Sequence, residues 1–326
     1  MRYFNISDGK NMLTLPKIAI GSDILGSPAL PEKDAHILYD IYKDAGGTCI
    51  DTARMYADWL ENGKNASETC VGNYIKSRNN RSELIISTKG GHPVLGQMDI
   101  GRLSKEDLTY DLDQSLKYLQ TDYVDIYWLH RDDVSRETSD IMETLNSFIK
   151  DGKVRFIGVS NWHMSRIREA NKYAAESRLH PLVSSQIQWS LAKSNNELFG
   201  DPTLVCMDET EYTQYLADNF CVINYGSQAK GFFTKAANDP SYLSKKAKDR
   251  FATDENMKRL EAIKSVSAQT GLSVTQLALA YITCNAVPSS AIVGCKTPAQ
   301  LYDSLSAADT VISQEIINKL TLGEIY

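Results

Sequence analysis

The sequence predicts an α/β protein that folds as a (β/α)8 barrel, or TIM barrel. Short runs rich in Ile, Val and Tyr alternate with amphipathic helical segments from one end of the chain to the other, which is typical of parallel strands joined by crossover helices. About eight such repeats within 326 residues favour a closed barrel over an open doubly wound sheet. No G-x-G-x-x-G motif follows the first strand, as a Rossmann dinucleotide site would require. We therefore expect residues 1–326 to form one barrel domain.

Eight segments carry the strand pattern, and each is short and apolar, as a strand buried on both faces should be. In chain order they are Lys17–Gly21, Thr48–Asp51, Leu84–Thr88, Tyr123–Leu129, Phe156–Ser160, Leu182–Ile187, Cys221–Tyr225 and Ala291–Val293. The carboxyl ends of the strands meet at one mouth of such a barrel. Polar residues that follow these runs are therefore the first candidates for chemistry.

Several helix starts are also visible between the strands. Ser104 and Asn65 each stand three residues before an acidic residue, which predicts a capping arrangement at a helix start. Thr297 followed by Pro298 predicts another cap with proline at the first helical position. An apolar stripe over residues 141–149 predicts a helix that ends near Asp151-Gly152.

The segment Gly226–Asn256 breaks the alternation of strands and helices. It is rich in Gly, Ser, Lys and Asp and has little strand character. A connection of this length usually has a function. The composition is compatible with a lid beside the active face and also with a surface excursion that contains a short helix.

Composition excludes several classes of protein. Lys and Arg number 35 and Asp and Glu 41, so the net charge is −6, which disfavours a nucleic-acid binder or a polybasic membrane-surface protein. The densest basic run, Lys245–Arg250, is expected to be a solvated face that could steer a polyanionic cofactor. No stretch approaches the ~20 apolar residues of a membrane span, and the N-terminus lacks a signal peptide. The six cysteines form no metal or redox motif, so we expect reduced thiols, no metal and a cytoplasmic location.

Four polar side chains follow the strand runs and supply one coherent mechanism. Asp51 ends the second run, Tyr56 follows in the next loop, Lys89 ends the third run and His130 ends the fourth. A phenol has an ordinary pKa of about 10, and a neighbouring ammonium is expected to lower the pKa of Tyr56. A carboxylate would hold that ammonium, and a neutral imidazole would orient a substrate oxygen. Such a set can protonate a carbonyl oxygen while hydride reaches the carbon.

Four motifs carry a resemblance to a known family. They are GGTCIDTARMY at 46–56, IISTK at 85–89, LKYLQTDYVDIYWLH at 116–130 and GKVRFIGVSN at 152–161. In this order and spacing they resemble the signatures of the aldo-keto reductases. The runs HRDD at 130–133 and SQAKGFF at 227–233 resemble the bacterial branch similar to aryl-alcohol dehydrogenases. The resemblance implies a barrel that binds a nicotinamide cofactor without a Rossmann fold.

The resemblance also implies roles for the four residues. Tyr56 would be the general acid, Lys89 and Asp51 would tune it, and His130 would orient the carbonyl. The implied reaction is reduction of an aldehyde or ketone, aryl or sugar-derived, to the alcohol. The expected partner is a small-molecule carbonyl or alcohol substrate, with no nucleic acid and no membrane. The same groups would serve the reverse oxidation.

Cofactor positions carry over from the same resemblance. Ser160, Asn161 and Gln186 would hydrogen-bond the carboxamide, and Tyr225 would stack on the nicotinamide ring. The phosphates would lie against residues of two further segments, namely Gly226, Ser227, Gln228 and Gly231 in one and Gly294, Lys296, Gln300 and Ser304 in the other. This chain has Gly-Ser-Gln at 226–228 where most family members have Ser-Pro-Leu. Lys296 stands where the family often binds a 2′-phosphate, which favours NADPH (NADP+) over NADH.

Three tryptophans are candidate walls of the substrate site, because aromatic residues often line it in this family. These are Trp59, Trp162 and Trp189. Packing of large side chains beneath loops is an equally good explanation for each. Trp128 is expected in the core. His92, in the tight loop after Lys89, could contact substrate, but a position that faces solvent is favoured.

Two other functions stay open at this point. Some relatives of this barrel are regulatory subunits that sense the cofactor with little turnover, although the complete set of four polar residues argues against that role. A different barrel enzyme, such as an isomerase or lyase, would bind no nicotinamide. The sequence leaves the oligomeric state open.

Overall fold

The fold is a closed barrel of eight parallel strands, as the sequence predicts. The structure is a computed structural model that describes all residues from 1 to 326. The barrel strands are β3 (Ile18–Gly21), β4 (Cys49–Asp51), β5 (Ile85–Gly90), β6 (Val124–Leu129), β7 (Val154–Ser160), β8 (Leu182–Gln186), β9 (Cys221–Asn224) and β10 (Ser289–Val293). Each pairs with its neighbours in sequence, and β10 pairs with both β9 and β3, which closes the barrel. Each of the eight predicted strands is present, with ends shifted by two residues at most.

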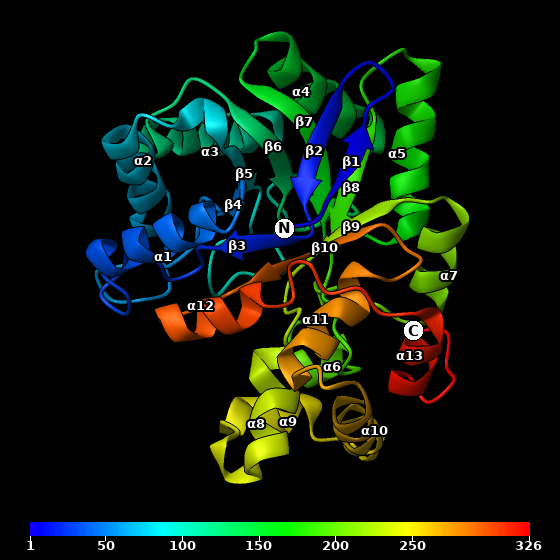
Figure 1. Cartoon of the computed structure of the whole chain (residues 1–326). Coiled ribbons are helices and arrows are strands. Elements are labelled where there is room, and N and C mark those ends of the chain that lie inside the picture. The colour runs from blue at the N-terminus through cyan, green and yellow to red at the C-terminus, as the bar shows by residue number, and fades with distance from the viewer.

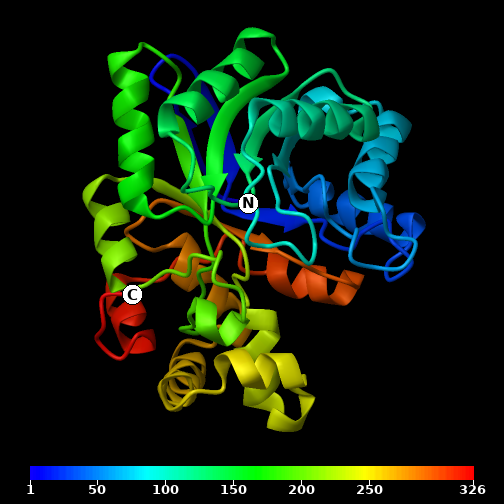
Figure 2. The same cartoon turned by 180° about the vertical axis from the view of Figure 1, so that it is seen from behind.

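Helices surround the barrel, and Figures 1 and 2 show them from opposite sides. They are α1 (Glu32–Asp44), α2 (Ala66–Arg78), α3 (Lys105–Leu119), α4 (Thr138–Lys150), α5 (Met164–Glu176), α6 (Asn196–Phe199), α7 (Glu209–Ala217), α8 (Phe232–Asn238), α9 (Lys245–Phe251), α10 (Asp254–Thr270), α11 (Val274–Thr283), α12 (Pro298–Leu305) and α13 (Gln314–Leu320). Short 3-10 turns lie at Arg81–Glu83, Ala229–Gly231 and Pro240–Tyr242. No helix is both long enough and apolar enough to cross a membrane.

The predicted helix caps have mixed outcomes. The Ser104 hydroxyl accepts from the Asp107 backbone N–H at 3.0 Å and caps α3, and Thr297 caps α12 with Pro298 at its first position. The predicted Asn65 cap is wrong. Asn65 has a left-handed backbone, and its side chain accepts from Arg54 at 2.6 Å instead of capping α2.

An antiparallel hairpin that we did not predict lies at the N-terminus and closes one end of the barrel. Its strands are β1 (Tyr3–Ser7) and β2 (Met12–Pro16). Its buried residues Ile6, Leu13 and Leu15 belong to the same apolar cluster as side chains from the amino ends of the barrel strands. The polar side chains at the carboxyl ends of the strands are therefore left to form the other mouth.

The segment Gly226–Asn256 is mainly helical rather than an extended loop. It holds α8, α9 and the start of α10, which gather on one side of the barrel in Figures 1 and 2. Phe232, Phe233 and Phe251 are buried in the main core. The prediction of a surface excursion with a short helix thus understated the helix content, because α8 and α9 are each only seven residues long and show little apolar periodicity.

Candidate active site

The four predicted catalytic residues meet at the carboxyl-terminal mouth of the barrel. Asp51 is the last residue of β4, Lys89 lies one residue before the end of β5, and His130 directly follows β6. Tyr56 lies in the loop after β4, just before Ala57, whose φ of 70° is left-handed. Such a backbone is uncommon outside glycine and turns the chain sharply. The Tyr56 and His130 rings then lie 5.8 Å apart between centroids, nearly perpendicular to each other.

Lys89 is the centre of this arrangement. Its Nζ donates to Asp51 Oδ2 at 2.5 Å, to the Thr52 carbonyl at 2.8 Å and to the Tyr56 hydroxyl at 2.9 Å. These contacts use all three N–H groups of an ammonium, and a neutral amine would have only two. The Asp51 carboxylate at 2.5 Å favours the cationic form of Lys89, and a cationic Lys89 donates to the Tyr56 oxygen. The phenolic proton is left free to point elsewhere.

Asp51 is fixed by two further donors. Ser87 Oγ and Gln186 Nε2 each donate to Asp51 Oδ1 at 2.7 Å, and the Trp128 indole donates to Ser87 Oγ at 2.6 Å. Sequence reasoning missed Ser87. It lies two residues before Lys89 on the same strand, so the alternation of side chains puts both inside the barrel. That spacing could have revealed it.

Burial decides the protonation of the tyrosine and the histidine. Burial, helped by the Asp51 carboxylate, raises the pKa of the Tyr56 phenol well above its ordinary value. The expected lowering by Lys89 is absent because Asp51 compensates the ammonium charge at 2.5 Å. Burial also lowers the pKa of Lys89, and Asp51 acts in the opposite direction. At neutral pH the phenol keeps its proton.

His130 is neutral, as the proposed chemistry requires. Burial, together with neighbouring His92 and Arg131, lowers the pKa of His130 well below 6.5. Its Nδ1 is buried and has no hydrogen-bonding partner in the protein. Any hydrogen bond from this ring to a ligand in the mouth must therefore come from Nε2.

The residues predicted to bind the carboxamide lie beside this cluster. Ser160 Oγ donates to the Gln186 carbonyl at 2.9 Å, and Asn161 Nδ2 donates to Ser160 Oγ at 3.0 Å. The Tyr225 hydroxyl donates to Asn161 Oδ1 at 2.7 Å. Gln186 Oε1 is buried without a partner. This unused acceptor is what an N–H group of a nicotinamide carboxamide would need, so the residues fit the cofactor.

The two predicted phosphate segments also come together. Gln228 Nε2 donates to Ser304 Oγ at 3.1 Å, and Ser227 Oγ donates to the Ile292 carbonyl at 2.6 Å. Gln300 Oε1 accepts from the Lys296 backbone N–H at 2.8 Å at the start of α12. The remaining predicted residues, Gly226, Gly231 and Gly294, lie within the same two segments.

The family assignment follows from comparison with known proteins. The sequence profile of the Aldo/keto reductase family matches residues 17–322. This chain belongs to the aldo-keto reductases. It is accordingly an NAD(P)H-dependent oxidoreductase of a family that acts on small-molecule carbonyl compounds, and the isomerase or lyase alternative is removed.

Curated relatives share about a quarter of their residues with this reductase. An aryl-alcohol dehydrogenase of Pestalotiopsis microspora is 27% identical over 95% of this chain and 78% of its own length. A probable voltage-gated potassium channel subunit beta of rice is 26% identical over 98% of this chain and 95% of its own. A norsolorinic acid reductase of Aspergillus flavus is 27% identical over 88% and 70%. Fungal and plant proteins are thus among the matches, and the bacterial branch stays a prediction.

The three candidate tryptophans of the reductase differ in exposure. Trp59 is 46% exposed, and its ring centroid lies 6.2 Å from that of Tyr56. Trp162 and Trp189 are 0% and 1% exposed and belong to the main core. Their indole N–H groups donate to the Arg131 carbonyl at 3.4 Å and to the Tyr281 hydroxyl at 3.2 Å. Only Trp59 offers surface to a substrate, and packing accounts for the other two. Trp128 is in the core, as expected.

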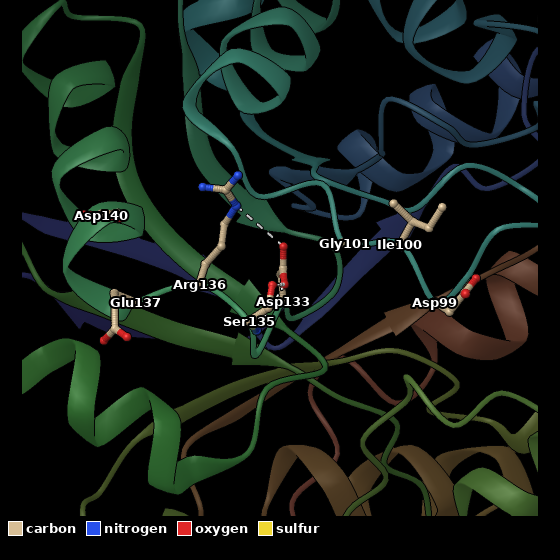
Figure 3. Close-up of a pocket in the computed structure, with 8 residues that line it drawn as sticks. All are labelled: Asp99, Ile100, Gly101, Asp133, Ser135, Arg136, Glu137 and Asp140. Atoms are coloured by element: carbon tan, nitrogen blue, oxygen red, sulfur yellow. Dashed lines mark hydrogen bonds and ion pairs between the residues drawn. The ribbon is translucent and has the colours of Figure 1, made fainter.

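An open acidic groove of about 600 Å³ lies between the loops that follow β5 and β6 (Figure 3). Its charged lining residues are Asp99, Asp133, Arg136, Glu137 and Asp140. Arg136 and Asp133 form an ion pair at 3.6 Å across part of it. None of the four candidate catalytic residues lines this groove.

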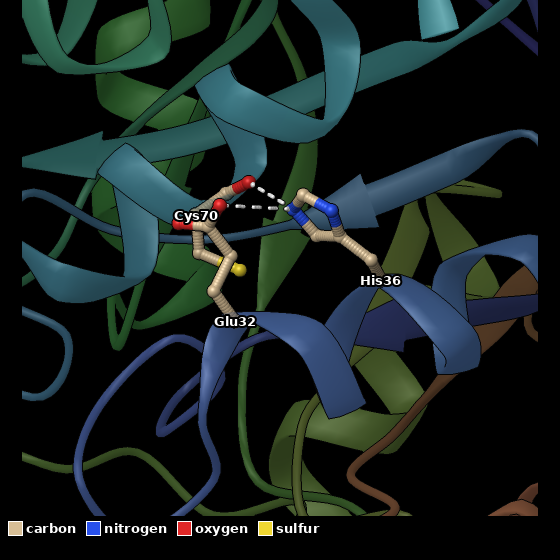
Figure 4. A group of neighbouring side chains, drawn as sticks. All are labelled: Glu32, His36 and Cys70. Carbon is tan, nitrogen blue, oxygen red and sulfur yellow. Dashed lines mark hydrogen bonds and ion pairs between the residues drawn. The ribbon is translucent and has the colours of Figure 1, made fainter. Parts of the chain in front are cut away.

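A second polar cluster joins α1 to α2 outside the barrel. The potential ligand atoms of Glu32, His36 and Cys70 lie within 4.8 Å of one another (Figure 4). The His36 Nε2 faces the Cys70 carbonyl at 3.2 Å, and because a carbonyl only accepts, this nitrogen carries a proton. Burial raises the pKa of the Cys70 thiol to about 12. In the structure these contacts join α1 to α2. All six cysteines are free thiols, as predicted.

Proposed function

We propose that residues 1–326 act as a single barrel domain that reduces an aldehyde or ketone with NADPH, with Tyr56 as the general acid. The observation that carries this proposal is the set of three hydrogen bonds made by Lys89 Nζ. They hold an ammonium against the Tyr56 oxygen and leave the phenolic proton for the substrate. NADPH, when bound, supplies the hydride for the carbonyl carbon.

The residues of the chain perform the rest of the reaction. His130 Nε2 orients the carbonyl oxygen, and Tyr56 donates its proton to that oxygen. The negative charge that develops on the Tyr56 oxygen is then stabilised by Lys89, which is already in hydrogen-bonding contact with it. Asp51 keeps Lys89 in place throughout. Trp59 forms one wall of the substrate site, and Ser160, Asn161, Gln186 and Tyr225 hold the nicotinamide.

The preference for NADPH is supported by a concentration of positive charge around the two phosphate segments. Burial and the neighbouring cations Lys246, Arg250 and Lys296 all lower the pKa of Lys230. A bound polyanion would relieve this repulsion, and Lys296 provides a charge for the 2′-phosphate that NADH lacks. The start of α12 lies beside it, and the positive end of a helix favours a phosphate. Pro298 has no N–H and Thr297 accepts from the Gln300 N–H, so Ala299 is the residue of the first helical turn whose backbone N–H is left for an anion.

The proposal is tested by following loss of NADPH absorbance with a panel of aldehydes, ketones and keto-sugars. The wild-type protein is compared with Tyr56→Phe, after titration of cofactor fluorescence has shown that the variant still binds NADPH. We expect turnover that falls by about 10²-fold or more in the variant, which is the usual contribution of a general acid. Undiminished turnover by Tyr56→Phe would show that another group donates the proton.

One alternative function has support of its own. Two plant relatives carry the description of a probable potassium channel subunit beta, and one of them aligns over 98% of this chain. A regulatory role would give tight NADPH binding, negligible turnover with the whole panel and a stable protein partner in pulldown experiments. Turnover that depends on Tyr56 favours the reductase.

A further inference from the structure

His92 is a second imidazole at the mouth of the barrel, contrary to the expectation that it faces solvent. It lies in the loop that follows β5, and only 8% of its surface is exposed. This loop is clamped on both sides of the residue. Asp111 Oδ2 accepts from the Gly91 backbone N–H at 2.9 Å, and Arg102 Nη1 donates to the His92 carbonyl at 3.0 Å. Gly91 has φ +72°, so this turn suits glycine.

The contacts of the His92 ring define its tautomer. Nδ1 lies 2.6 Å from the Pro93 carbonyl, and because a carbonyl only accepts, Nδ1 carries the proton. Burial and the charge of Arg131 lower the pKa of His92 to about 4, so the ring is neutral near pH 7. Nε2 is then a lone-pair acceptor. It makes no hydrogen bond within the protein and, unlike His130 Nδ1, is not sealed from solvent.

This acceptor lies next to the residue that orients the substrate. The His92 and His130 rings are 4.7 Å apart between centroids and nearly perpendicular. If the carbonyl oxygen is held by His130 and Tyr56, the neighbouring position at His92 suits a group that donates a hydrogen bond. If His130 holds the carbonyl oxygen, a group on the adjacent carbon atom is the part of the substrate nearest to the His92 ring. A hydroxyl group is the common donor at this position.

We propose that His92 is a specificity-determining residue that accepts a hydrogen bond from a hydroxyl group on the carbon next to the substrate carbonyl. The preferred substrates are then α-hydroxy aldehydes and α-hydroxy ketones. This inference rests on the proposed function, because it needs the carbonyl to lie at Tyr56 and His130. A simple packing role for His92 would require no particular group on the substrate.

The test compares a matched pair of ketones, α-hydroxyacetophenone and acetophenone, which differ only in the hydroxyl group. We expect the wild type to favour the hydroxylated ketone by about tenfold in kcat/KM, the usual worth of one good hydrogen bond. His92→Phe keeps a ring against His130 but removes the acceptor, and it should abolish this ratio by lowering activity with the hydroxylated ketone alone. His92→Gln places an amide oxygen near the former Nε2 and should restore part of the ratio. His163→Phe, which removes an imidazole with a 68% exposed side chain, is the control and should leave the ratio unchanged.

Calorimetric binding of both ketones, with and without NADP+, accompanies the kinetics. The inference is supported if the wild type binds the hydroxylated ketone more tightly than acetophenone and His92→Phe loses this difference. This holds even if neither ketone is turned over, because absence of turnover would count against the proposed function alone. Equal binding and equal kcat/KM of the two ketones in the wild type would overturn the inference. It would also be overturned if His92→Phe weakened both ketones to the same extent, because that result indicates a packing role.

Discussion

Replacing the buried Glu68 by Gln should make the protein more stable at alkaline pH. Glu68 lies on α2 against β5 and is 1% exposed. Thr88 Oγ1 donates to its Oε1 at 2.6 Å, while its Oε2 is buried without a partner. Burial raises the pKa of Glu68 from the ordinary 4.5 to about 7. The folded protein therefore prefers the protonated carboxyl, and ionising it above neutrality destabilises the fold.

The magnitude follows from the difference between the two pKa values. Each pKa unit corresponds to about 1.4 kcal/mol, so about 2.5 units give about 3 kcal/mol. Below pH 4.5 the carboxyl is protonated in both states and costs nothing. As pH rises from about 4.5 through about 7, the unfolded chain has lost its proton while the folded chain retains it, so the free energy of unfolding falls. Above this window the full loss of about 3 kcal/mol remains.

The assay is urea unfolding followed by tryptophan fluorescence, measured in steps between pH 5 and pH 8.5. The quantity of interest is the free energy of unfolding of Glu68→Gln minus that of the wild type, because the titration of other groups cancels in this difference. We expect the difference to grow by about 2–3 kcal/mol across the range. Glu176→Gln, at a side chain that is 65% exposed, is the control and should give a flat difference. A flat difference for Glu68→Gln as well would refute the reasoning.

Three further substitutions probe the site. Asp51→Asn leaves the Lys89 ammonium buried without its counter-charge, so the free energy of unfolding in urea should fall by about 3–5 kcal/mol. Activity should collapse as well. An equally stable variant would mean that Lys89 is neutral in the fold. Lys296→Ala should weaken NADPH binding by about tenfold or more in fluorescence titration and leave NADH binding nearly unchanged, whereas equal losses for both would remove the 2′-phosphate assignment. Gly90→Ala would put a methyl group 1.9 Å from the Tyr127 hydroxyl, and this overpacking should destabilise the fold by about 1–3 kcal/mol and lower the melting temperature. An unchanged melting temperature would show that Tyr127 moves freely.

The barrel and its four polar residues could be predicted because both depend on local pattern. Parallel strands buried on both faces produce continuous apolar runs, and the carboxyl end of each run shows where a side chain enters the mouth. Asp51, Lys89 and His130 were found this way. Ser87 obeys the same rule of alternation, but a serine inside an apolar run carries no obvious chemical signal.

The features that sequence reasoning missed depend on contacts between distant segments. The β1–β2 hairpin is short and acquires its apolar partners only when the barrel has formed. Asn65 fails as a cap because Arg54 takes its side-chain oxygen. Trp162 and Trp189 have the same local context as a pocket wall, and only the packing of α-helices and loops around them shows that they are buried. Such differences are tertiary and have no local signature.

The raised pKa of Tyr56 is the clearest case of a tertiary effect with a chemical consequence. A lone ammonium would have favoured the phenolate, but Lys89 is paired with Asp51 inside a site closed to water, so the pair presents little net charge to the phenol. The phenol is thus protonated in the resting state, and in the proposed reaction it is ready to donate this proton. Reduction can start from the resting state, whereas oxidation of an alcohol must first remove that proton. Under the proposed function, we therefore expect the resting protein near neutral pH to be ready for reduction of a carbonyl rather than for oxidation of an alcohol.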